Sequence, residues 1–229
     1  IRQFKSMENI KIDNIIRTKR RTIALVVTRD ARLIVRAPIK TPESYIISIV
    51  KKKERWVRKK INEIKLRPSL PDKGFVNGES FLFLGRSYPL RIKTNIPQPV
   101  ILSDEIEDNI AEPSIIKETL IKWYKDEAKN KIAERCESIS KITGYKPASV
   151  KISNAKKRWG SCSHRGELNF SWHLILAPME IIDYVIVHEL VHLEVKNHSK
   201  HFWNKVRTIM PDYNDRRHWL KQNGRDLLI

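Results

Sequence analysis

The spacing of hydrophobic and polar residues changes several times along the chain, and each change marks a predicted element. Residues 22–28 and 32–36 alternate with the two-residue period of a β-hairpin. Residues 41–64 keep a helical spacing of apolar side chains, which a Thr-Pro pair opens. Residues 74–93 predict a second hairpin. The first part of the chain is therefore expected to be β-rich with one helix.

A longer helix is predicted in the second part of the chain. Residues 113–143 place apolar side chains on one face, and Gly144 ends the pattern. A connector that contains proline and acidic residues (95–112) precedes this helix. Residues 149–153 then alternate as a strand, and residues 158–172 predict another hairpin.

These elements predict an α+β fold with a β-rich N-terminal region and one helix over residues 7–110, and a second domain over residues 111–229. No apolar run reaches eighteen residues, so no membrane-spanning helix is expected. Cys136 and Cys162 are the only cysteines in the sequence. Such sparse cysteine use favours a reducing compartment and therefore a cytoplasmic protein.

Composition adds a strongly basic charge to this picture. Lys and Arg number 45 against 26 Asp and Glu, which gives a net charge of +19 and a pI near 10.0. A basic surface can bind nucleic acid or anionic substrates. The Ile- and Lys-rich composition explains the same excess without a partner, and runs such as Lys51-Lys52-Lys53 are typical of solvated faces. Aromatic residues do not alternate with basic ones in a stacking pattern, so nucleic acid stays an alternative partner.

Candidate chemistry lies in the segment His188-Glu189-Leu190-Val191-His192. Residues 181–187 before it are apolar nearly all round, which predicts a buried helix. Imidazoles four residues apart lie one turn apart on the same helix face, so both can reach one metal ion. The glutamate beside the first histidine can then act on a metal-activated water. The alternative is a buried helix whose histidines are satisfied by ordinary hydrogen bonds.

A third ligand is needed, because a catalytic zinc site usually takes three protein ligands and leaves a fourth position for water. On a continuous helix His198 would lie ~9 Å along the axis from His192, too far for zinc–nitrogen bonds of about 2 Å. The helix must therefore stop, and Asn197 tolerates the left-handed conformation that ends helices. Ser199 can cap a following helix, so that a tight reversal presents His198. His201 is the rival ligand, although it falls inside that second helix.

Several segments around these residues form a specific combination. They are Arg158-Trp159-Gly160-Ser161-Cys162-Ser163, residues 182–190, His192-Leu193, Asn197-His198-Ser199, Phe202-Trp203, Pro211-Asp212-Tyr213 and Trp219-Leu220, with Ala37-Pro38, Trp56 and Gly85-Arg86-Ser87-Tyr88 in the N-terminal half. Together they resemble the YgjP-like metallopeptidase family of zincins, which is related to the SprT-like and WLM groups. The resemblance covers nearly the whole chain from about Ile10.

The resemblance implies a zincin-like catalytic domain with an HExxH active-site helix, a long packing helix and a small antiparallel sheet. It also implies that His188, His192 and His198 are the metal ligands and that Glu189 is the catalytic base. The implied cofactor is one zinc ion, with other divalent metals as alternatives.

A second electrophile is expected to stabilise the oxyanion of the reaction. Tyr213 is the candidate we favour, and Arg216, Arg217 and His218 follow close behind it in the sequence. Packing after Pro211 is the alternative role for Tyr213.

The sequence therefore predicts a zinc-dependent hydrolase, a metallopeptidase that cleaves peptide bonds in a peptide or protein with a metal-activated water and Glu189 as general base. One alternative is a metal-dependent nucleotide or phosphoanhydride hydrolase, in which basic side chains would converge on the metal. The other is a basic, zinc-stabilised module that binds nucleic acid. Its structural metal site would have four protein ligands and no open position.

Overall fold

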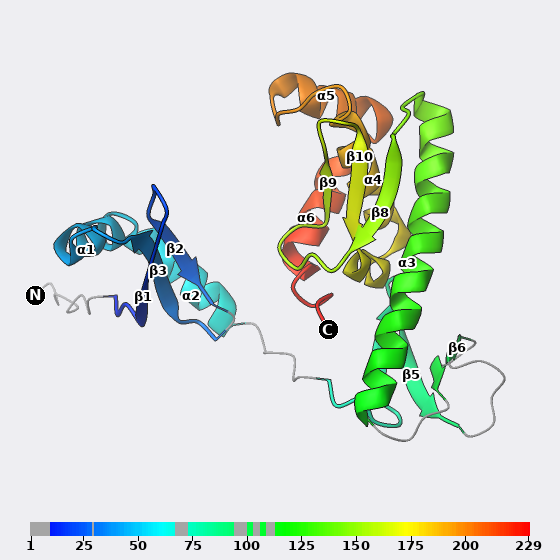
Figure 1. Cartoon of the computed structure of the whole chain (residues 1–229), viewed down its shortest axis with the longest axis horizontal. Helices are drawn as coiled ribbons and strands as arrows, with labels where there is room; N and C mark the ends of the chain where they lie inside the picture. Colours follow the sequence, from blue (N-terminus) through cyan, green and yellow to red (C-terminus); the bar gives the residue numbers. More distant parts are fainter. Residues whose placement is uncertain (1–9, 29, 67–72, 94–99, 103–105, 109–112) are drawn as a thin grey trace, which may run out of the picture. The chain divides into compact units, whose positions relative to one another are not determined.

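The computed structural model describes residues 10–28, 30–66, 73–93, 100–102, 106–108 and 113–229 (Figure 1). The packing of the chain divides it into two compact units, Ile1–Pro71 and Asp72–Ile229. The sequence places the boundary near residue 110 instead. The earlier division has a physical cause, because Phe81 and Leu90 are buried in the same core as the long helix of the second unit.

The N-terminal unit contains a three-stranded sheet. Strand β1 (Asn14–Thr18) pairs parallel to β3 (Leu33–Pro38), and β2 (Ala24–Val27) pairs antiparallel to the other side of β3. The predicted strands at 22–28 and 32–36 are confirmed as β2 and β3. Strand β1 was not predicted, because its alternation is too short to distinguish it from a loop.

Two helices cover one face of this sheet. α1 (Glu43–Lys52) and α2 (Glu54–Lys65) replace the single predicted helix, because the backbone at Lys53 leaves the helical region with φ −104° and ψ 12°. Alternate residues of β3 face the two helices, as the two-residue period of a strand requires. The buried core of the unit consists of Leu33, Val35, Ala37, Ile46, Val50 and Val57.

The second unit begins with a four-stranded sheet in the order β4-β5-β7-β6. Strands β4 (Ser80–Phe83) and β5 (Arg86–Ile92) form the predicted hairpin. Strands β6 (Val100–Leu102) and β7 (Ile106–Asp108) lie within the predicted connector, and β7 pairs parallel to β5. The connector therefore contributes to the sheet as well as joining elements.

The tip of the β4–β5 hairpin anchors the chain just before the helix that carries the candidate site. Leu84 and Gly85 both have positive φ, 48° and 79°, as a type I′ turn requires. Their backbone N–H groups donate to the carbonyls of Ile175 and Leu176 at 2.9 and 3.2 Å. A Cβ on Gly85 would lie 2.6 Å from Cγ of Pro178, so glycine is required at this approach.

The long helix α3 (Pro113–Thr143) is confirmed, and a second sheet follows it. Strand β10 (Glu167–Ser171) lies between β8 (Ser149–Ser153) and β9 (Gly160–Cys162). This sheet is mixed, because β8 runs parallel to β10 while β9 and β10 form the predicted antiparallel hairpin. Within the described residues, neither α3 nor any other helix combines the length and hydrophobicity that crossing a bilayer requires.

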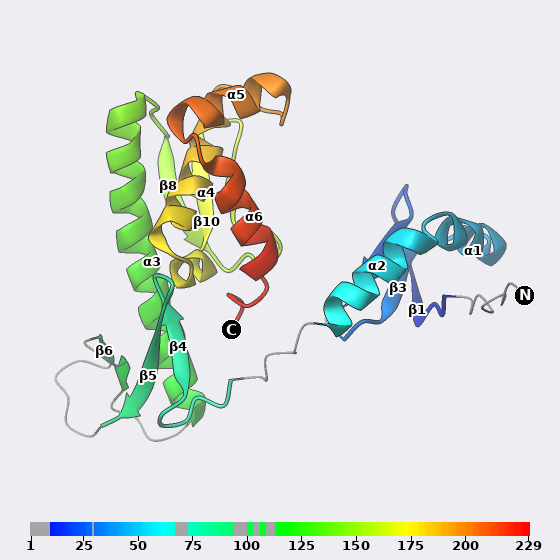
Figure 2. The same cartoon turned by 180° about the vertical axis from the view of Figure 1, so that it is seen from behind.

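The short 3₁₀ helix η1 (Trp172–Leu176) leads into α4 (Met179–Val191), which is followed by α5 (Lys200–Ile209) and α6 (Tyr213–Asn223). Figures 1 and 2 show from opposite sides that α4 lies against the β8-β10-β9 sheet, between α3 and α6. This central position explains why α4 is apolar nearly all round. Its buried residues are Ile181, Ile182, Tyr184, Val185, Ile186, Val187, Glu189, Leu190 and Val191.

An ion pair fixes α4 to α3. Arg135 donates two hydrogen bonds to the carboxylate of Asp183, at 2.9 and 2.8 Å. A bidentate guanidinium–carboxylate pair constrains orientation as well as distance. The helix that carries the candidate site is therefore held both by apolar packing and by this pair.

Candidate metal centre

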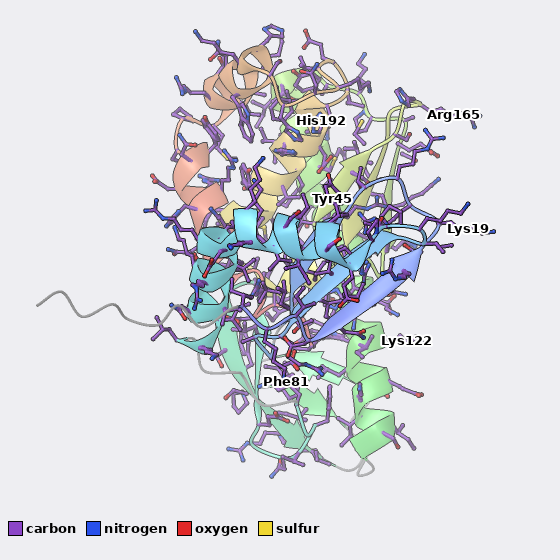
Figure 3. All side chains as sticks on the ribbon, turned by 90° about the vertical axis from the view of Figure 1, so that its left-hand side faces the viewer. Lys19, Tyr45, Phe81, Lys122, Arg165 and His192 are labelled. Atoms are coloured by element: carbon purple, nitrogen blue, oxygen red, sulfur yellow. The ribbon has the colours of Figure 1, made fainter. Side chains whose placement is uncertain are left out.

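Three histidine side chains converge where α4 ends. His188 lies in the last turn of α4, His192 is its C-terminal cap, and His198 follows in the loop before α5. Figure 3 labels His192 at this end of the helix. Nε2 of His198 lies 2.9 Å from Nε2 of His188 and 3.1 Å from Nε2 of His192. The candidate ligand nitrogens of all three lie within 4.8 Å of one another.

The chain reverses between α4 and α5, and this reversal brings the third imidazole back. α4 ends at Val191, earlier than the predicted stop at Asn197, and the N–H of Val195 donates to the carbonyl of Val191 at 2.9 Å. The Asn197 side chain accepts the N–H of Ser199 at 3.2 Å. Ser199 caps α5 as predicted, since its side chain accepts a backbone N–H of the first turn. His198 is thereby held between two defined turns.

The protonation of the cluster suits a cation. The Nδ1–H of His192 donates to the Val195 carbonyl at 2.9 Å, because a carbonyl can only accept. In the neutral imidazole, Nε2 of His192 then presents a lone pair to the cluster. Burial, followed by the neighbouring His192 and His198, lowers the pKa of His188 to about 3, so this imidazole is neutral at pH 7.

The spacing of the nitrogens fits zinc. Two nitrogens bound at about 2.0–2.1 Å in a tetrahedral site are ~3.3 Å apart, close to the 2.9 and 3.1 Å distances of this cluster. Among the described residues the cluster contains three possible ligands and no fourth. Three ligands with a remaining position are the pattern of catalytic rather than structural zinc sites.

Aromatic side chains of α5 hold the imidazoles in place. The Phe202 ring centre lies 4.9 Å from that of His188 and 4.5 Å from that of His192. Trp203 stacks on His198 with ring centres 5.7 Å apart and planes 24° from parallel. These contacts restrict rotation of the three imidazoles, which matters most for His188, whose Nδ1 is buried without a hydrogen-bond partner.

The side chain of Glu189 is buried where α4 faces strand β9 of the second sheet. Its side chain is 6% exposed, and burial raises the pKa of Glu189 to about 7 although the charge of Arg158 acts in the opposite direction. A Cβ at Gly160 of β9 would lie 2.6 Å from Cγ and Oε1 of Glu189. Glycine at this position therefore leaves the space that the carboxylate occupies. The sequence contained Gly160 within a motif but no signal of this contact.

In the metal-free protein, Glu189 is expected to reduce the free energy of unfolding as the pH rises. Its folded pKa of about 7 lies above the usual 4.5, so its stabilising contribution is complete below about pH 4.5 and is lost as the pH rises through about 7. The loss should be about 3 kcal/mol. Urea unfolding with a chelator present measures the free energy of unfolding of Glu189→Gln and of the unsubstituted protein. The difference in favour of Glu189→Gln should be larger at pH 8 than at pH 5. Titration of His188 occurs in both proteins and therefore cancels in this difference. An equal difference in the free energy of unfolding at both pH values would contradict the prediction.

Four residues were candidates to stabilise the oxyanion, and two of them, Tyr213 and Arg217, contact the indole of Trp203 beside the histidines. The buried Tyr213 ring stacks on Trp203 with ring centres 5.4 Å apart and planes 18° from parallel. The Arg217 guanidinium lies 4.5 Å from the centre of the same indole, and Arg217 is exposed. The charge of Arg217 contributes to lowering the pKa of both His188 and His198. Among the described residues, Arg217 is the cation whose charge acts on both of these histidines.

The other sequence candidates are engaged elsewhere. Arg216 forms an ion pair with Asp212 at 2.8 Å, and His218 shares a hydrogen bond with Gln222 at 2.7 Å. His201, the rival ligand, is exposed on α5 and does not belong to the histidine cluster.

Comparison with known proteins finds a family match over most of the chain. The family described as YgjP-like, metallopeptidase domain, matches residues 21–223. Two solved metallopeptidase zymogens are similar in structure, abylysin of Pyrococcus abyssi and jannalysin of Methanocaldococcus jannaschii. Abylysin has 24% identity and a TM-score of 0.36, over 39% of this chain and 93% of its own. Jannalysin has 21% identity and a TM-score of 0.36, over 40% of this chain and 94% of its own. No curated protein matches the chain.

Proposed function

The chain belongs to the YgjP-like metallopeptidase family, and on this premise we propose that it is a zinc-dependent peptidase whose metal is bound by His188, His192 and His198. Family membership makes it a metal-dependent hydrolase. The observation that carries the proposed site is the convergence of three Nε2 atoms. That of His198 lies 2.9 Å from that of His188 and 3.1 Å from that of His192. The hydrogen bond from Nδ1 of His192 to the Val195 carbonyl, which directs Nε2 toward the cluster, and the neutral state of His188 support the same assignment.

Glu189 is the proposed general base. When bound, the zinc ion would polarise the scissile carbonyl and lower the pKa of the attacking water. Glu189 would accept a proton from that water and deliver it to the leaving amine. A burial-raised pKa near 7 suits a group that must both accept and release a proton at neutral pH.

Strand β9 is the proposed binding edge for the substrate backbone. It pairs with β10 on one side and ends the β8-β10-β9 order, and its Gly160 contacts Glu189. An extended peptide can add to such an edge through main-chain hydrogen bonds. A peptide in this position would pass beside the general base.

Arg217 is the side chain we propose to stabilise the oxyanion, with Tyr213 as the alternative. A charge directed at a developing oxyanion lowers the barrier without further reorganisation. Arg217 is supported by its exposure and by its electrostatic effect on His188 and His198. Tyr213 has a packing role already, since its ring is buried against Trp203.

Arg217→Gln is expected to lower kcat/KM by about 10²- to 10³-fold, as the loss of one oxyanion donor does. Metal content should not change, because Arg217 is not a ligand. Tyr213→Phe is the matched variant, since it keeps the ring on Trp203 and removes only the hydroxyl. If Tyr213→Phe shows the large loss and Arg217→Gln does not, the oxyanion role belongs to Tyr213.

Gly160→Ala is expected to lower kcat by about 10²-fold, the effect of displacing a catalytic group by about 1 Å. The new Cβ would meet the Glu189 carboxyl at 2.6 Å. Metal content should be retained. Gly74→Ala is the control, because its nearest atom would be 3.7 Å away. Equal kcat values for the two variants would show that the Gly160 contact does not position Glu189.

The proposed function is tested by comparing substrates. Zinc-loaded protein should cleave an unfolded protein, and a chelator should abolish cleavage until zinc is restored. Nucleoside triphosphates should not be hydrolysed. Hydrolysis of triphosphates without peptide cleavage would favour the phosphoanhydride alternative, and stoichiometric zinc without hydrolysis of either substrate would favour a structural site.

A further inference from the structure

The N-terminal unit carries most of the net charge of the chain. Residues 1–71 contain 20 Lys and Arg against 6 Asp and Glu, a net charge of +14, whereas residues 72–229 contain 25 against 20, a net charge of +5. A general bias toward lysine would spread the excess over both units. The concentration of charge in the smaller unit therefore indicates a polyanionic partner for that unit.

Acidic neighbours do not neutralise the cations of α1 and α2. Glu54 pairs with Arg58, and Glu63 pairs with Lys60, each at 2.8 Å. Among the described residues no carboxylate pairs with the remaining exposed cations of these helices and their junction. They are Lys51, Lys52, Lys53, Arg55, Lys59 and Lys65.

Exposed aromatic rings lie among these cations. Trp56 on α2 is 46% exposed, and the helical repeat places Lys59 and Lys60 beside it, three and four residues later. Tyr45 on α1 is 56% exposed (Figure 3) and shares a helix flank with Lys52, seven residues later. The spacing between rings and cations is helical, so the rings and cations do not alternate simply along the sequence.

We propose that the N-terminal unit binds single-stranded nucleic acid, with a base stacked on Trp56 and phosphates on the cations of α1 and α2. Single-strand binders combine a positive surface with aromatic rings on which bases stack. A duplex would keep its bases away from the indole. A bilayer would need one continuous apolar face, yet Ile47, the other large exposed apolar residue of α1, lies on a different flank from Tyr45. The proposal is independent of the metal centre.

Fluorescence anisotropy with a labelled oligo(dT) of about 16 nucleotides tests the stacking contact. Trp56→Ala should weaken binding about tenfold or more, the loss expected for one stacked base. Trp56→Phe, which keeps a ring, should retain most of the affinity and shows that the position tolerates substitution. Unchanged binding by Trp56→Ala would overturn the proposal.

Salt dependence tests the charge contacts. Substituting Lys52, Lys53, Arg55 and Lys59 by Gln should reduce the slope of log K against log salt by up to about 3, at ~0.7 per phosphate contact. The matched control removes the same charge from four exposed lysines of the second unit. These are Lys122, which Figure 3 labels, Lys129, Lys146 and Lys221. The control should keep the slope of the unsubstituted protein.

Three results would overturn the proposal. They are equal losses of affinity in the two quadruple variants, binding to a duplex of the same length at least as tightly as to the single strand, and binding to phosphatidylserine vesicles without binding to oligo(dT). Each measurement uses the full chain, and peptide hydrolysis should be unchanged in all variants of α1 and α2. Loss of peptidase activity in the Glu189 variant leaves the nucleic-acid result unaffected, so the two proposals can fail separately.

Discussion

Replacing Glu189 by glutamine is expected to lower peptide hydrolysis by at least about 10²- to 10⁴-fold, the contribution of a positioned general base. Glutamine has nearly the same shape and fits the space beside Gly160. It cannot accept the proton, so the loss should appear in kcat. Metal content, measured by mass spectrometry, should stay near one ion per chain, because Glu189 is not among the clustered ligands.

Glu194→Gln is the control for this substitution. Glu194 lies just beyond α4, is exposed, and pairs with Lys205 at 2.9 Å and Tyr145 at 3.2 Å. Its replacement removes the same charge near the site without removing a proposed catalytic group, so full activity is expected. Full turnover by Glu189→Gln on any substrate would contradict the proposed role of Glu189.

Replacing His198 by alanine is expected to weaken zinc binding by about 10²- to 10³-fold. A four-ligand structural zinc site contributes about 10–16 kcal/mol, or about 2.5–4 kcal/mol per ligand. Nε2 of His198 lies 2.9 and 3.1 Å from Nε2 of His188 and of His192, the other two proposed ligands. Removing it leaves a two-ligand site, so activity should fall together with metal occupancy. Competition with a chelator of known zinc affinity measures the change.

His201→Ala is the matched control, since it removes an imidazole three residues further along. His201 is exposed on α5 and lies outside the cluster, so zinc affinity should be unchanged. Loss of zinc in His201→Ala with normal zinc in His198→Ala would show that His201, and not His198, is the third ligand.

Local sequence spacing predicted much of the fold. The hairpins at 22–36 and 74–93 and the helix at 113–143 follow from periods of two and of 3.6 residues, which depend only on neighbours along the chain. Strand β1 and the short strands β6 and β7 were not predicted. Strands β1 and β7 pair in parallel with the non-adjacent strands β3 and β5, and β6 is only three residues long, so no local period reveals them.

The sequence by itself determined the helical pair of histidines, because four-residue spacing on a helix brings His188 and His192 to one face wherever the helix lies. It also predicted the reversal that returns His198, since Ser199 is a local capping signal. Only the tertiary structure decided that Gly160 lies against Glu189 and that Arg217 lies over Trp203. These contacts join segments separated in the sequence, and burial created by the whole core raises the pKa of Glu189. Packing across the fold, rather than local pattern, therefore sets the environment of the proposed chemistry.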